Sequence, residues 1–315
     1  MQTFSFPDPF AAKRPSSAFN TLLLLALMLL YPLVGAALFS LVAGELQLSE
    51  LLSNPDSRLV PMLRTIQSLG QIVVLALPVL LLAAWHTRSK QPFSRNTLAF
   101  LGIRPHLNLG TAALAVTGIF LLQPLLYTIT SLQDSYLWPS LGEAGAEVVR
   151  QRKAMEGLIT ALARVGSISE FFQVAFVLAV TPALCEELLF RGYIQQNYTR
   201  SMSSGNAVFW TGCVFAFFHL SAANLIPLAL LGWYIGYIYS RTGNLAIPVV
   251  AHLMNNLAAL LALMLGYDQD TASASQVHAF VVTPLWWLLV FVCLLLFVMV
   301  VRRFAAVQAS AHNGV

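Results

Sequence analysis

Long apolar stretches dominate this chain and constrain its fold more than any other feature. Hydrophobic residues make up 58% of the 315 residues and charged residues only 10%, whereas soluble domains carry roughly 25% charged residues. A helix needs about 20 apolar residues to cross a bilayer. Windows of that length predict spans at 19–43, 67–86, 109–131, 171–194, 206–220, 222–240, 245–266 and 284–301. The predicted fold class is therefore an all-α, polytopic membrane bundle of about eight transmembrane helices.

The distribution of charge predicts how the chain is oriented in the membrane. The segment Met1–Ser17 lacks the small-residue cleavage pattern of a secretory signal, so we expect the first hydrophobic stretch to remain as an anchor. One assignment of sides puts most basic residues together and leaves most acids in the opposite loops. Those opposite loops also hold Arg58, Arg64, Arg150, Arg152, Lys153 and Arg164. By the positive-inside rule, we expect both termini in the cytoplasm of a multi-pass plasma-membrane protein, with a bacterial host the expected setting.

Two connecting loops, 44–66 and 133–169, mix apolar and charged residues at helical spacing. Such segments can lie along the membrane interface. Two interpretations stay open for them: a lid or ramp for a substrate, or a solvated loop with a short amphipathic helix. Segment 87–108 is basic and favours contact with anionic lipid. The lipid bilayer is thus an expected partner, whereas nothing in the sequence indicates nucleic-acid binding.

Two adjacent glutamates, Glu186 and Glu187, stand within an otherwise apolar stretch. A carboxylate inside a bilayer is costly unless it is paired, protonated or used in function. Glu187 and Arg191 are four residues apart on one helix face, which predicts an ion pair between them. Glu186 then points about 100° away around the helix and is free to face a cavity.

His219, His252 and Asn256 are further polar residues in later apolar stretches. Counted at about 1.5 Å per residue from the nearest inner-side turn, Glu186, His219 and His252 lie at similar depths of roughly 16–21 Å. Taken singly, either histidine could be a hydrogen-bonded core residue. Together with Glu186 and Asn256 they supply a base for water and donors for an oxyanion, which amide hydrolysis requires.

Stripes of small residues predict close helix packing. Gly232, Gly236 and Ser240 form one stripe, and Gly212 and Ala216 form another. The spacing suits contacts within one chain as well as contacts between chains, so it leaves the oligomeric state open.

Two other classes of protein remain as alternatives. Intramembrane Glu, His and Arg also mark transporters and proton relays, but here the polar residues cluster at one depth and no inverted repeat is evident. A non-catalytic membrane scaffold is the second alternative. It would be favoured if substitution of Glu186 left function unchanged.

The polar residues also form three motifs that resemble a known family. The motifs are Glu186-Glu187-Leu-Leu-Phe-Arg191 (EExxxR), Phe215-Ala-Phe-Phe-His219 (FxxxH) and His252-Leu-Met-Asn-Asn256 (HxxxN). In this order they resemble the CAAX protease and bacteriocin-processing (CPBP, or Abi) intramembrane proteases, which include the type II CAAX prenyl endopeptidases. The resemblance covers roughly residues 170–266.

The resemblance implies a role for each motif residue. It implies an intramembrane endopeptidase in which Glu186 activates water with help from His219, while His252 and Asn256 stabilise the oxyanion. Glu187 and Arg191 would support that geometry. The implied partner is a membrane-associated peptide or protein, with or without a lipid tail.

The expected division of the chain follows from the resemblance. Residues 1–169 would form helices one to three with the interfacial loops, residues 170–266 the catalytic core, and residues 267–315 the last loop, the last helix and a cytosolic tail.

A metal remains an alternative, because Glu186, His219 and His252 are also a plausible zinc set. The HExxH pattern is absent, and Asn256 suits an oxyanion donor better than a zinc ligand. We therefore expect no required cofactor, with zinc as the alternative.

Overall fold

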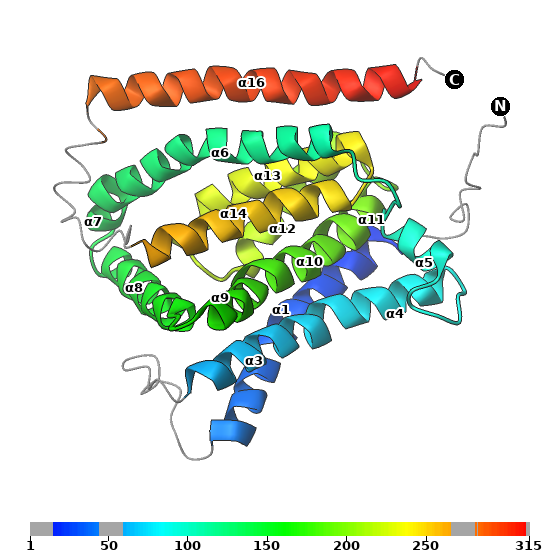
Figure 1. The fold of residues 1–315 in the computed structure, drawn as a ribbon, viewed down its shortest axis with the longest axis horizontal. Helices are drawn as coiled ribbons and strands as arrows, with labels where there is room; N and C mark the ends of the chain where they lie inside the picture. Colours follow the sequence, from blue (N-terminus) through cyan, green and yellow to red (C-terminus); the bar gives the residue numbers. More distant parts are fainter. Residues whose placement is uncertain (1–14, 44–58, 266–280, 282, 313–315) are drawn as a thin grey trace.

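Helices make up the regular structure of the computed structural model, which describes residues 15–43, 59–265, 281 and 283–312 (Figure 1). No strand occurs among these residues. The α-helices are α1(Ser17–Ala43), α3(Val60–Gln71), α4(Leu77–His86), α5(Arg95–Phe100), α6(Leu109–Leu132), α7(Trp138–Ser140), α8(Glu143–Ala163), α9(Ile168–Ala175), α10(Thr181–Glu187), α11(Gln196–Tyr198), α12(Ser204–Phe218), α13(Leu225–Thr242), α14(Ala246–Met264) and α16(Pro284–His312). Four π-helical segments join some of them: η1(Ile72–Ala76), η2(Gln133–Leu137), η3(Phe176–Val180) and η4(Leu188–Gln195).

Each of the eight expected apolar stretches is largely helical, which confirms an all-α polytopic membrane protein. In the described chain, 6 helical runs are long and apolar enough to cross a membrane: Ser17–Leu41, Val60–His86, Leu109–Ser140, Ile168–Tyr198, Ala246–Met264 and Pro284–Ala306. The expected spans 206–220 and 222–240 correspond to α12 and α13, which lie outside these six. Helix α12 has only 15 residues. At about 1.5 Å per residue it is about 22 Å long, shorter than the roughly 30 Å hydrocarbon core.

The second hydrophobic helix begins at Val60, earlier than the expected residue 67. It therefore includes Arg64, which the charge distribution had assigned to an outer loop. The Arg64 side chain is buried, and its Nε donates to the carbonyl of Leu162 at 3.0 Å while its Nη2 donates to the carbonyl of Arg164. These acceptors let a cation lie inside the bundle. The rest of the expected loop, 44–58, lies outside the described residues.

The other expected interfacial segment contains a long helix, α8, as its helical spacing predicted. Gly142 precedes this helix with φ 57°, a left-handed conformation that favours glycine. Asp134 and Arg152 form an ion pair at 2.7 Å, and this pair ties α8 to η2. Together with Arg64 at the other end, it fixes α8 to the bundle. Both interpretations of this segment, a lid or ramp for a substrate and a solvated loop with a short amphipathic helix, stay predictions.

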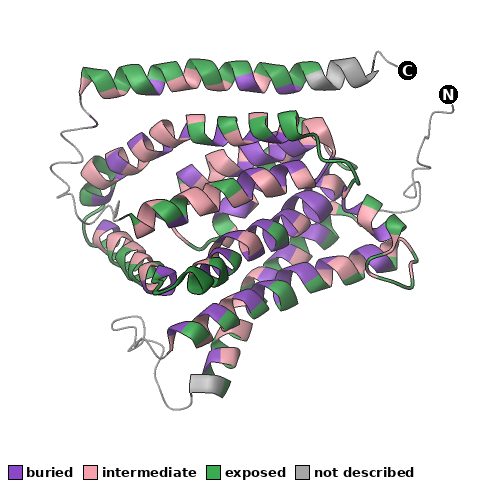
Figure 2. Ribbon diagram, in the orientation of Figure 1, coloured by how far each residue is buried: buried purple, intermediate pink, exposed green. Residues whose placement is uncertain are grey.

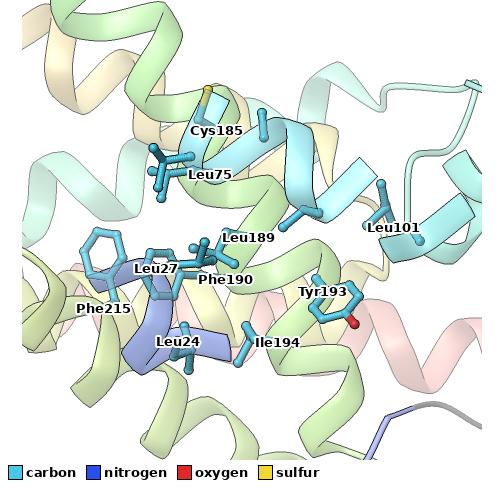
Figure 3. Packing of buried hydrophobic residues seen from close by; sticks show 14 of the residues in the cluster. Leu24, Leu27, Leu75, Leu101, Cys185, Leu189, Phe190, Tyr193, Ile194 and Phe215 are labelled. Atoms are coloured by element: carbon cyan, nitrogen blue, oxygen red, sulfur yellow. The ribbon is translucent and has the colours of Figure 1, made fainter. Parts of the chain in front are cut away.

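Burial is concentrated where the helices face one another, and the outer faces are exposed (Figure 2). One apolar core joins α1, η1, α4, η4 and α12 through residues such as Leu27, Leu75, Phe190 and Phe215 (Figure 3). A second core joins α6, α13, α14 and α16. In Figure 1, the run α9–α10–α11 passes through the middle of the molecule. The two adjacent glutamates thus lie on a central element.

Helices α12 and α13 approach closely at the predicted stripes of small residues. A Cβ added to Gly232 would lie 3.0 Å from the Cα of Gly212, and one added to Gly212 would lie 2.9 Å from the backbone nitrogen of Trp233. Trp233 also donates from Nε1 to the carbonyl of Phe209 at 2.9 Å. The stripes are therefore used for packing within the chain.

Candidate active site

The segment that carries Glu186 and Glu187 is α10, a short helix between two π-helical segments, η3 and η4. Pro182 follows η3 within the continuous helical run Ile168–Tyr198, so its missing N–H removes one hydrogen bond from that run. The hydroxyl of Thr181 donates to the carbonyl of Phe176 at 2.9 Å. π-Helical turns are rare and occur often at functional sites, because the wider turn changes which side chains face inward.

Glu187 forms the predicted ion pair with Arg191, and Nη1 of Arg191 lies 2.9 Å from Oε1 of Glu187. Both side chains are 0% exposed. The same Oε1 is 2.8 Å from Nδ1 of His252 on α14. Nη2 of Arg191 donates to the carbonyl of Gly232 on α13 at 3.0 Å. One buried charge pair therefore connects three helices, and sequence spacing indicated only its local part.

His219 lies beyond the last residue of α12, which corrects the expectation that it sits deep within a membrane-spanning helix. The helix ends because Leu220 adopts a left-handed conformation with φ 51°. The Nδ1 of His219 is 2.7 Å from the carbonyl of Phe215. A carbonyl can only accept, so this nitrogen carries the proton and Nε2 of the neutral ring has a lone pair.

Glu186, His219 and His252 converge from three helical elements. Oε2 of Glu186 is 3.8 Å from Nε2 of His219 and 4.0 Å from Nε2 of His252. This is far closer than the separation of about 10 Å beyond which the groups could not act on one reacting centre. The Glu186 oxygen is buried and has no hydrogen-bond partner among the described residues. A buried acceptor facing histidine nitrogens needs a proton, a water or a cation between them.

Asn256, the fourth predicted residue, follows His252 by one helical turn on α14. Its Oδ1 accepts from Nδ2 of Asn255 at 3.3 Å. No hydrogen bond to Glu186 joins it directly to the converging group within the described residues. Nδ2 of Asn256 likewise has no acceptor in that part of the chain.

Phe215 is the residue at the site whose contacts the sequence did not indicate. Its ring packs edge-on against His219, with ring centres 4.7 Å apart, and against His252 at 6.0 Å. The guanidinium carbon of Arg191 lies 4.7 Å from the centre of the same ring, a cation–π distance. Figure 3 shows Phe215 at the edge of the buried apolar cluster. The first position of the FxxxH pattern was the only available signal for it.

The donor set suits a zinc ion by its chemistry but not by its spacing. Ligand atoms about 2.0–2.1 Å from a tetrahedral zinc lie about 3.3 Å apart, and the observed separations from Glu186 are 3.8 and 4.0 Å. In the described part of the chain, no group of three or more His, Cys, Asp or Glu side chains is placed to hold a metal ion.

A recess of about 250 Å³ lies elsewhere, at the junction of α5, α11, α12 and α13. Its lining mixes polar and apolar surface and includes Arg104, Gln196 and Tyr239. None of the converging residues lines it, so we place the candidate chemistry at Glu186 on geometry and not in this recess.

The helical bundle and the side chains of Glu186, His219 and His252 define a polytopic membrane protein with a polar site between its helices. Residues 168–258 match the family described as type II CAAX prenyl endopeptidase Rce1-like. The match confirms the resemblance read from the three motifs, and it contains Glu186, His219, His252 and Asn256. It supports intramembrane endopeptidase activity in general. Searches of curated proteins and of solved structures gave no match.

Proposed function

We propose that the chain is an intramembrane endopeptidase in which Glu186 activates the attacking water. The observation that carries this proposal is the convergence of the Nε2 atoms of two histidines on one buried, unpartnered oxygen of Glu186, at 3.8 and 4.0 Å. A water between Glu186 and His219 can donate one hydrogen to each acceptor. Glu186 then takes the proton as the water attacks the carbonyl carbon, and gives it to the leaving amine.

The two histidines have different roles in this proposal because their Nδ1 partners differ. His219 is bonded to a neutral carbonyl, so its free nitrogen suits the acceptor that orients water. His252 is bonded to the carboxylate of Glu187, which can stabilise an imidazolium. In that form His252 donates from Nε2 to the developing oxyanion, and Asn256 supplies a second donor.

The proposed substrate is a membrane-associated protein or peptide. The family that matches residues 168–258 is named for prenyl endopeptidases, so a carboxyl-terminal tail with a prenyl group is one substrate arm and an unmodified peptide the other. We propose a plasma-membrane location with both termini in the cytoplasm, because the basic residues are concentrated in the segments assigned to that side.

Cleavage by the purified full-length protein in liposomes tests the function. Quenched-fluorescence peptides with and without a prenyl tail would be compared for wild type and Glu186→Gln. Loss of the base should lower kcat by about 10²–10⁴-fold. Glu147→Gln, a change of the same kind on the half-exposed Glu147 of α8, is the control and should leave kcat unchanged.

Unchanged cleavage by Glu186→Gln would refute the proposed role. A proton flux that depends on Glu186 in the same liposomes, without any cleavage, would favour the relay instead. A chelator provides the metal test: unaffected cleavage supports the metal-free proposal, whereas loss that zinc restores would assign Glu186, His219 and His252 as ligands.

A further inference from the structure

Three side-chain amides connect α6 to the candidate active site. Nε2 of Gln123, on α6, donates to Oδ1 of Asn255 at 3.0 Å. Nδ2 of Asn255 in turn donates to Oδ1 of Asn256 at 3.3 Å. Asn256 shares a helix face with His252, whose Nε2 is 4.0 Å from Glu186. The chain of amides therefore ends beside the polar site.

The direction of this chain is set at its outer end by a backbone carbonyl. Nε2 of Gln123 also lies 3.5 Å from the carbonyl oxygen of Ile119, one turn earlier on α6. A carbonyl can only accept, so the amino side of Gln123 must face it. Because the amino group of Gln123 also faces Asn255, the Asn255 side chain must present its oxygen there as the acceptor. The amino group of Asn255 requires the oxygen of Asn256 in the same way.

The consequence for Asn256 is that its amino group has no acceptor among the described residues. An asparagine amide presents either its oxygen or its nitrogen in a given direction, and the two orientations have nearly the same shape. Only the nitrogen can donate to an oxyanion. With its oxygen held by Asn255, Nδ2 of Asn256 has no acceptor within the described residues and remains available.

We propose that Gln123 and Asn255 are positioning residues that hold Asn256 with its amino group available as an oxyanion donor. The inference rests on the proposed function, and neither residue belongs to the three motifs. Both act through Asn256 and not on the substrate. A donor that is already oriented costs no reorganisation when the oxyanion forms, so the effect should fall on kcat and not on KM.

Kinetics of the full-length protein in liposomes would test this, with the best-cleaved quenched-fluorescence peptide. Asn255→Leu keeps a similar volume but removes the hydrogen bonds, and Gln123→Met does the same at the α6 end of the chain. Each should lower kcat about ten-fold with KM unchanged, less than the roughly 10²-fold expected for Asn256→Ala. Thr117→Val, at an exposed position of α6, is the matched control and should keep the wild-type kcat.

A double-mutant cycle separates positioning from a merely structural role. Asn255→Leu and Gln123→Met should cause no further loss of kcat when Asn256 is already alanine. Losses that multiply, a change confined to KM, or wild-type kcat in both single variants would overturn the inference. Thermal melting identifies a variant that fails to fold. If either Asn255→Leu or Gln123→Met fails to fold, the kcat of the other variant tests the inference.

The same measurements separate this inference from the function beneath it. Full kcat for Asn256→Ala, together with loss for Glu186→Gln, would reject the positioning role and leave the endopeptidase proposal intact. Full kcat for Glu186→Gln would reject the proposed function itself.

Discussion

Glu187 and Arg191 show at the scale of single residues how this chain keeps charges inside a bundle. The pair is fully buried, and each partner has a further hydrogen bond, Glu187 to His252 and Arg191 to the carbonyl of Gly232. Burying a charge pair is compensated only when geometry and extra hydrogen bonds are good. Removing one partner is much worse than removing both, because it leaves an uncompensated buried charge.

Arg191→Ala should therefore lower stability by about 3–5 kcal/mol. Arg191→Lys should recover only part of this, because a lysine lacks the planar fork that reaches Glu187 and Gly232 together. Thermal unfolding and folded yield in detergent are the measurements. Arg95→Ala, at an exposed position, is the control and should stay close to wild type. A wild-type melting temperature for Arg191→Ala would show that the pair does not stabilise the fold.

At the scale of elements, the position of α12 against α13 decides where His219 lies. Helix α12 ends at Phe218, and His219 follows directly. Gly212 and Gly232 allow the two backbones to approach, with the added-Cβ distance from Gly232 to the Gly212 carbonyl oxygen only 3.1 Å. Any side chain at these glycines would push the helices apart and move His219 relative to Glu186.

Gly212→Ala should destabilise the protein by about 1–3 kcal/mol through overpacking and lower kcat at the same time. Gly205→Ala is a matched control in the first turn of the same helix, where an added Cβ meets no atom within 4 Å. There alanine should be neutral or slightly stabilising, since it forms helix better than glycine. Melting temperature and kcat of both variants check this. Equal behaviour of the two variants would contradict the close-approach explanation.

At the scale of the whole molecule, the helices outside the matched region hold the central elements in place. Helix α6 packs on α14, and α3 packs on α10. Arg64 adds a polar link between α3 and the end of α8, and the Asp134–Arg152 pair fixes the rest of α8. Helix α8 is thus joined to the bundle at two places.

Arg64→Met should release the end of α8, because the carbonyls of Leu162 and Arg164 lose a charged donor. Such hydrogen bonds contribute about 1.5–3 kcal/mol. Hydrogen exchange should become faster in α8 and in residues 164–167, with little change in the middle of α14. Thr65→Val, at the exposed neighbouring position on α3, is the control. Unchanged exchange in α8 would show that Arg64 is not what holds its end.

The sequence by itself determined the membrane class, the helical character of the apolar stretches and the Glu187–Arg191 pair. These follow from composition, run length and i,i+4 spacing, all of which are local. The three motifs also indicated which region would match a family. The matched depth of Glu186, His219 and His252 was predicted by counting residues, and Oε2 of Glu186 does lie within 4.0 Å of Nε2 of both histidines.

Only the tertiary structure decided how the groups from different helices are bonded to one another. It placed Glu187 against His252, ended α12 before His219, gave Phe215 contacts to both histidines and Arg191, and connected Gln123 to Asn255. The predicted start of the second span at residue 67 was wrong, and the helix begins at Val60. The reason is that Arg64 can be buried once α8 supplies carbonyl acceptors. The physical reason is general: residue spacing fixes neighbours along one helix, but contacts between helices depend on their relative rotation and height. Here π-helical turns on both sides of α10 change that rotation in a way that residue counting does not contain.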